Sequence, residues 1–233
     1  VPLAAAPRPQ GACWAADECI YFVPDWQKSV VRIHAGGGSS AGGGKDSSGV
    51  ESVAEPDLAG GEIALLCPEM LPGGRHLLCA AYGGQARAGA GLGGAGALDE
   101  APIVAIDLRT LQRKPLIHAG SNPRFITSGH LVFTRNGSLF AAPFDPDRLE
   151  VLGTPAEVIH GIMGNALGGS AHCGFSIEGT AVYAPGTMAS AERTLLIASR
   201  AGTDAPKNAL LPHAPFAAPS LAPTCPRRVG VQM

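Results

Sequence analysis

The stretch Pro123 to Gly153, PRFITSGHLVFTRNGSLFAAPFDPDRLEVLG, carries the pattern that decides the fold of this chain. A bulky apolar residue, Phe125, is followed by a short turn-forming group, and then by an apolar run that reads as a β-strand. A second β-like run, Ser138 to Phe144, follows and ends in the turn formers DPDR. Short strands separated by tight turns predict an all-β chain in which successive strands pair.

The same plan, a bulky apolar residue, a turn and a strand, occurs in five units along the chain. The bulky residues are 56, 55, 50 and 46 residues apart, near the ~40 to 50 residues of a β-propeller blade. These structural blade anchors are Trp14, Met70, Phe125, Phe175 and Leu221. The units that contain them are Cys13 to Phe22, Pro68 to Cys79, Pro123 to Phe133, Cys173 to Tyr183 and Pro219 to Val231. The repeat predicts a run of propeller blades.

Other β-like runs lie between these units and supply the remaining strands of four-stranded antiparallel blades. The expected third strands are Val30 to Ala35, Pro102 to Leu108, Ser138 to Phe144 and Thr194 to Arg200. Lys114 to His118 and Glu157 to His160 are weaker and suit short outer strands. A meander sandwich also has short strands at even spacing. It has no reason, however, to repeat one local sequence in successive units.

We expect residues 1–233 to form a single propeller region, interrupted by two Gly-rich loops at 36–49 and 83–96. These tracts of Gly, Ser and Ala have little to bury and would lose much backbone entropy on ordering. We therefore expect both to be mobile. The strand pattern resumes after each of them, so neither is interpreted as a domain boundary.

Pro123 to Gly153 closely resembles the propeller region that follows the kinase domain of bacterial serine/threonine protein kinases, within the TolB-like, WD-type propeller group. Pro68 to Cys79 resembles that group's blade start, Phe175 to Pro185 its FSDDGTLVYVP phrase, and Arg193 to Gly202 its RTLVWVDRQG phrase. Together these segments cover nearly the whole chain in the family's order.

The resemblance implies a six-bladed type of ring and a periplasmic or extracytoplasmic location. Five blade starts are visible, so about four and a half blades are expected, and unpaired edges would favour association. The family's turn is typically Ser-Pro-Asp-Gly. Here Glu18 and Cys225 stand where its Gly would be, so these two turns are less well specified.

Composition excludes some classes of function. The formal net charge is −2 and the Lys and Arg residues are scattered, so no basic stripe for nucleic acid is present. No apolar run reaches the ~18 to 20 residues of a membrane span. The six cysteines match no zinc spacing. They are interpreted as small buried hydrophobes, with a disulfide such as Cys13 with Cys19 or Cys67 with Cys79 as the alternative.

The sequence contains no signature of catalysis. A phosphate-binding loop is not formed at Gly44 and Lys45, because Asp46 stands where Ser or Thr is needed. Neither G-x-S-x-G nor the kinase motifs H-R-D and D-F-G occur. The seven histidines are dispersed, and Asp145 and Asp147 are better explained by a turn than by calcium. We expect no cofactor and no metal.

The first strand of each blade lines the central channel of a propeller and can bind a peptide or partner protein. Glu69, Arg124, His172 and Ser220 flank the anchors and are the channel-side candidates, with ordinary loop or packing roles as the alternative. The sequence thus predicts a non-catalytic scaffold for protein or peptide binding. The alternative is an accessory propeller of an enzyme, a serine/threonine kinase first and a prolyl-oligopeptidase-like peptidase second.

Overall fold

A computed structural model describes residues 2–26, 28–36, 49–83, 100–164, 170–176, 180–186, 196–198 and 207–208. All its regular elements are β-strands. They are β1 (Ala12–Trp14), β2 (Cys19–Phe22), β3 (Val30–His34), β4 (Glu51–Ala54), β5 (Glu62–Met70), β6 (His76–Gly83), β7 (Ile103–Asp107), β8 (Arg113–Ile117), β9 (Ser121–Ile126), β10 (His130–Arg135), β11 (Ser138–Asp145), β12 (Glu150–Val151), β13 (Ala156–Ile159), β14 (Cys173–Phe175), β15 (Ala181–Tyr183), β16 (Leu196–Ala198) and β17 (Lys207–Asn208).

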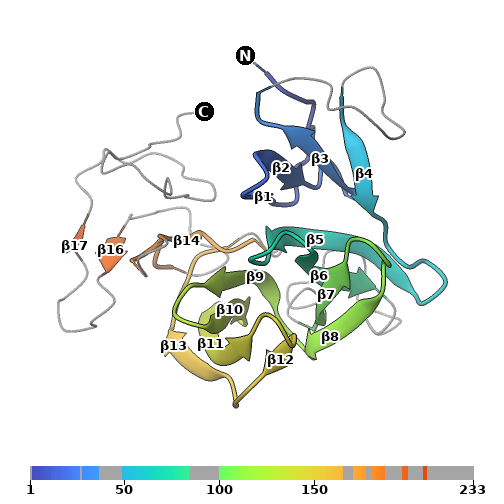
Figure 1. Cartoon of the computed structure of the whole chain (residues 1–233). Helices are drawn as coiled ribbons and strands as arrows, with labels where there is room; N and C mark the ends of the chain where they lie inside the picture. The colour runs from blue at the N-terminus through green and yellow to red at the C-terminus, as the bar shows by residue number, and fades with distance from the viewer. Residues whose placement is uncertain are drawn as a thin grey trace.

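The strands form four antiparallel meanders, which we name blades 1 to 4. Blade 1 has the order β1-β2-β3-β4, blade 2 β5-β6-β7-β8, blade 3 β9-β10-β11-β12 and blade 4 β14-β15-β16-β17. In blade 3 both β12 and β13 pair with β11, at opposite ends of that strand. Figure 1 shows the blades around a common centre, with β1, β5, β9 and β14 nearest to it. This arrangement is an incomplete all-β propeller.

The predicted strands agree closely with the structure. The expected third strands correspond to β3, β7, β11 and β16, and the two weak runs to β8 and β13. β5 begins at Glu62, six residues before the predicted unit, and β4 was not predicted. Residues 37–48 and 84–96 of the two Gly-rich segments, and the fifth unit with Leu221 and Ser220, lie outside the described residues.

Apolar side chains hold each blade against the blade before it. Met70 and Leu77 of blade 2 pack in a cluster with Tyr21 and Val30 of blade 1. The two blade 2 residues are partners across β5 and β6. The Cα partners Phe125 and Leu131 of blade 3 occupy the corresponding positions and pack on blade 2. Phe175 and Tyr183 of blade 4 pack in a cluster with residues of blade 3. These three anchors therefore lie at interfaces between blades.

Trp14 is the exception among the described anchors, because its side chain is 69% exposed. Its Cα partner is Ile20, just as the partner of Met70 is Leu77, so Trp14 lies on the blade face that points away from blade 2. That face carries Phe22, Val31 and Ile33, against which Leu3, Ala4 and Val50 pack. The expectation that Trp14 packs like the other anchors is corrected, since no blade precedes blade 1 among the described residues.

Acidic side chains close two of the turns between strands. Glu18 takes a φ of 59° at the position of the expected glycine, and the Asp17 carboxylate accepts the Cys19 amide at 3.1 Å. At the end of β11, Asp145 Oδ1 accepts the amides of Asp147 and Arg148 at 2.9 and 3.0 Å. The carboxylate thus closes the predicted turn.

None of the cysteines in the described residues forms a disulfide. Cys67, Cys79 and Cys173 are buried, whereas Cys13 and Cys19 are partly buried. The alternative pairings, Cys13 with Cys19 and Cys67 with Cys79, are therefore wrong for this structure. The cysteines act as packing residues, as small thiols commonly do.

Gly11 lets the start of blade 1 approach blade 2. Its φ is +105°, and a Cβ atom built on it would lie 2.7 Å from the Cα of Cys67. Beside it, the Cys67 amide donates to the Gln10 carbonyl at 2.8 Å. A side chain at residue 11 would push these two inner segments apart.

We predict that Gly11→Ala lowers the free energy of unfolding by roughly 2–4 kcal/mol, because it adds a clash to an unfavourable φ. Gly73 is the matched control, with φ +86° and no heavy atom within 4 Å of a built Cβ. Gly73→Ala should cost only about 1 kcal/mol. Urea denaturation of both variants measures the difference, and equal losses would show that the approach to Cys67 is not tight.

Candidate functional site

The inner strands of blades 2 and 3 share an unusual backbone. Cys67 and Asn122 each have a φ of 51°, and each is followed by proline. The register of β5 against β6 and of β9 against β10 shifts at these points, so both are bulges. Such bulges re-aim the next side chain, and strained backbone persists where the surroundings enforce it. The side chains that follow are Glu69 and Arg124.

Glu69 and Arg124 form an ion pair between blades 2 and 3. Arg124 Nη1 lies 3.3 Å from Glu69 Oε2, and the two side chains are 22% and 20% exposed. Nη1 also donates to the carbonyls of Pro68 and Pro123, at 3.4 and 3.3 Å. The amide of Phe125 hydrogen-bonds to the Glu69 carboxylate. Two predicted channel-side residues are therefore in direct contact at the inner strands.

Thiols surround this pair. Burial, reinforced by the charge of Glu69, raises the pKa of Cys13 to about 12. Burial raises the pKa of Cys173 to about 11 and also raises that of Cys67. The side-chain Nδ2 of Asn122 donates to Cys173 Sγ at 3.6 Å, which links blades 3 and 4. Since the thiols stay protonated near neutral pH, they are poor nucleophiles and the charges at the site are those of Glu69 and Arg124.

The other two candidates are placed differently. His172 precedes β14 and is 5% exposed, so its side chain is buried. Ser220 lies outside the described residues. Sequence reasoning missed Asn122 and the three thiols. The signal for Asn122 was present, because Cys-Pro-Glu-Met and Asn-Pro-Arg-Phe are two copies of one pattern: proline, a charged residue and then an anchor.

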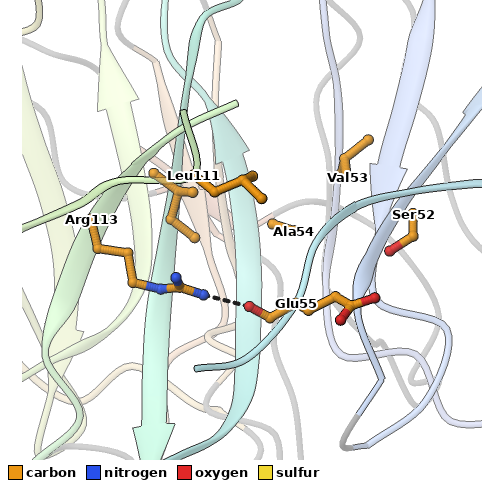
Figure 2. Close-up of a pocket in the computed structure, with 7 residues that line it drawn as sticks. Ser52, Val53, Ala54, Glu55, Leu111 and Arg113 are labelled. Atoms are coloured by element: carbon orange, nitrogen blue, oxygen red, sulfur yellow. Dashed lines mark hydrogen bonds between the residues drawn. The ribbon is translucent and has the colours of Figure 1, made fainter. Parts of the chain in front are cut away.

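A hollow lies at the outer strands, between blades 1 and 2. It has a volume of about 250 Å³, and its lining includes Val53, Ala54 and Leu111. Figure 2 shows Arg113 pointing across it toward the Glu55 carbonyl, to which Nη2 donates. Arg113 Nε also lies 3.2 Å from Glu62 Oε1. Glu62 neutralises the charge of Arg113, and the bond to the Glu55 carbonyl joins blade 2 to the end of blade 1.

Ser138, His160 and Glu157 on blade 3 are the residue types of a hydrolase catalytic triad. Ser138 Oγ and Glu157 Oε1 both lie 3.1 Å from the same atom, Nδ1 of His160. A triad needs the serine and the carboxylate on opposite ring nitrogens, so that the imidazole can carry a proton between them. The three residues therefore form a surface hydrogen-bond cluster.

No group of three or more His, Cys, Asp or Glu residues suited to a metal ion is formed within the described ranges. The same part of the chain contains no helical segment with the length and apolarity that a membrane crossing requires.

We predict an inverted pH dependence for Glu69. Burial raises the pKa of its carboxyl above the usual 4.5, and Arg124 opposes this shift. Folding then favours the protonated form, so the stability contributed by this group is present below pH 4.5 and is lost as pH rises through the folded-state value. The free energy of unfolding of the wild type, minus that of Glu69→Gln, should fall as pH rises from 4.5.

Glu157 is the matched control, because hydrogen bonds from Ser138 and His160 lower the pKa of its carboxyl. The free energy of unfolding of the wild type, minus that of Glu157→Gln, should change in the opposite direction and fall as pH falls. Urea denaturation across a pH series gives both differences. A flat or rising curve for Glu69→Gln would contradict its assignment as a desolvated carboxylate.

The chain matches no protein-family model and no curated protein sequence. Similar solved structures include a puromycin-hydrolysing peptidase from Mycobacterium tuberculosis, with 13% identity, 95% of this chain and 43% of that chain covered, and a TM-score of 0.54. TolB from Acinetobacter baumannii is 14% identical, with 86% of this chain and 43% of that chain covered and a TM-score of 0.52. The GH43 protein BlXynB from Bacillus licheniformis is 14% identical, with 90% of this chain and 42% of that chain covered and a TM-score of 0.50.

This chain spans less than half the length of each of those three chains. At such low identity the likeness bears on the fold alone. It agrees with the four meanders, the inner strands around one centre and the packing between blades. The chain therefore has the architecture of an incomplete β-propeller.

Proposed function

We propose that this chain is a non-catalytic propeller scaffold that binds a peptide or protein segment at the inner strands of blades 2 and 3. The observation that carries the proposal is the Glu69–Arg124 pair, held at 3.3 Å by two bulges of the same kind. Packing between blades is achieved by the apolar clusters and does not require this pair. Charged groups on a rigid inner strand are suited to recognition.

The pair offers both signs of charge to a ligand. A peptide backbone carries donors and acceptors, and a partially exposed carboxylate beside a guanidinium can bind both. The surrounding thiols and anchors supply apolar surface, which is typical of binding sites that have few polar groups. The nucleophilic groups described beside the pair are thiols whose pKa is raised, and this supports binding over catalysis.

We further propose that the scaffold belongs to a larger bacterial protein and acts outside the cytoplasm. The support is the resemblance of Pro123 to Gly153 to propeller regions that follow serine/threonine kinase domains. Ligand binding here would then serve as the sensing or interaction step of that protein. The complete reading frame tests this part, since an upstream kinase domain with a membrane span is expected and a downstream G-x-S-x-G motif would point to a peptidase.

We predict that peptides selected on the immobilised chain from a displayed random library bind at least tenfold more weakly to Arg124→Gln. Loss of a charge-assisted hydrogen bond costs about 1.5–3 kcal/mol, and 1.4 kcal/mol corresponds to a factor of ten. Fluorescence anisotropy with a labelled selected peptide gives the affinities.

Two control variants locate the site. Arg148→Gln changes a blade 3 arginine whose side chain is 75% exposed, and it should leave the affinity unchanged. Leu111→Ser alters the outer hollow and should also have little effect. Selection of no peptide at all, or binding that is lost in Leu111→Ser and kept in Arg124→Gln, would overturn the proposal.

A further inference from the structure

The contacts of Arg124 with the described residues are all made by one side of its guanidinium. All three acceptors described above, two carbonyls and the Glu69 carboxylate, are bound by the same nitrogen, Nη1. Within the described part of the chain, Nε and Nη2 have no hydrogen-bond partner. Among the described residues neither nitrogen is a buried atom without a partner, and the whole side chain is 22% exposed.

The geometry of the Nε–Nη2 edge selects a class of ligand. Nε and Nη2 of arginine point two N–H groups in parallel, and this spacing matches the two oxygens of a carboxylate. Nη1 is fixed by three acceptors, so the guanidinium is oriented before a ligand arrives. Preorganisation of this kind reduces the entropy cost of binding.

Charge also favours a carboxylate over a phosphate. Glu69 exerts the largest attraction among the charged neighbours of Arg124, and the thiols of Cys67, Cys13 and Cys173 lie around the same guanidinium. A carboxylate brings one further negative charge to this group. A phosphate brings about two beside Glu69, and the described groups that act on Arg124 include no second cation to balance them.

We propose that the Nε–Nη2 edge of Arg124 binds a carboxylate of the ligand, from a peptide C-terminus, an acidic side chain or a small carboxylic acid. The inference rests on the proposed function, because it assigns a chemical class to what the inner strands bind. Glu69 then acts as a positioning residue, since it holds Nη1 and so turns the opposite edge toward the ligand.

The test follows the Nε–Hε resonance of Arg124 in the ¹⁵N-labelled chain, assigned by comparison with Arg124→Lys. The probes are acetyl-trialanine with a free C-terminus, the same peptide as its amide, acetyl-Ala-Glu-Ala-amide, succinate and inorganic phosphate. We expect saturable shifts with the free-C-terminal peptide, the Glu peptide or succinate, and none with trialanine amide. Arg124→Lys should weaken binding at least tenfold, while Arg148→Lys should not.

The arms of the experiment identify the source of the carboxylate and separate this inference from the proposed function. Succinate binding without any peptide binding would support the carboxylate site and count against a peptide scaffold. Equal binding of acid and amide peptides, with an unmoved Arg124 resonance, would overturn the carboxylate site and leave the scaffold standing. Tighter binding of phosphate than of every carboxylate would also overturn it.

A second variant decides the matter should Arg124→Lys fail to fold, as judged by its backbone amide spectrum. Glu69→Gln keeps the arginine and an oxygen acceptor but removes the competing negative charge. It should bind succinate at least threefold more tightly than the wild type. Unchanged or weaker binding would contradict the proposal.

Discussion

Face-to-face packing of consecutive blades is the constraint on which the rest of this structure depends. A short strand meander has two faces, and each must be covered by another layer to bury its apolar side chains. Here Met70, Phe125 and Phe175 each fill the interface with the blade before them. That packing fixes the angle between blades and brings their first strands to one centre. The inner strands can then carry polar side chains and strained backbone, because the apolar clusters between the blades supply the stability.

The candidate site depends on this separation between apolar packing among the blades and polar residues on the inner strands. Glu69 and Arg124 are 55 residues apart in sequence and meet because they occupy equivalent positions in adjacent blades. Proline after Cys67 and Asn122 coincides with the bulge in each strand. The bulge directs one charged side chain toward its counterpart. A repeat architecture thus brings two unlike residues together by repeating a backbone geometry, while the side chains differ from blade to blade.

The sequence predicted the blades because their signals are local. An anchor, a turn and a strand lie within about ten residues, so the start of blade 3 at Phe125 to Phe133 can be predicted from its own residues alone. β4, with the letters ESVA, was missed because its two polar residues hide the alternation of an outer strand. Glu69 and Arg124 were each predicted from position, but their contact depends on how two blades meet. The exposure of Trp14 depends equally on a neighbour, and no local pattern encodes it.

The position of Trp14 on blade 1 shows that the row of blades has a direction. Blades 2, 3 and 4 each turn their anchor toward the blade before them, whereas the described residues that pack on the corresponding face of blade 1 are Leu3, Ala4 and Val50. A further layer on this face of blade 1 would meet the exposed Trp14 side chain and the residues that cover Phe22, Val31 and Ile33. The contact it makes is heterologous, since the two surfaces that meet are different, and heterologous contacts form closed rings or open chains according to the rotation they impose. Closure is therefore a matter of angle as much as of the number of blades.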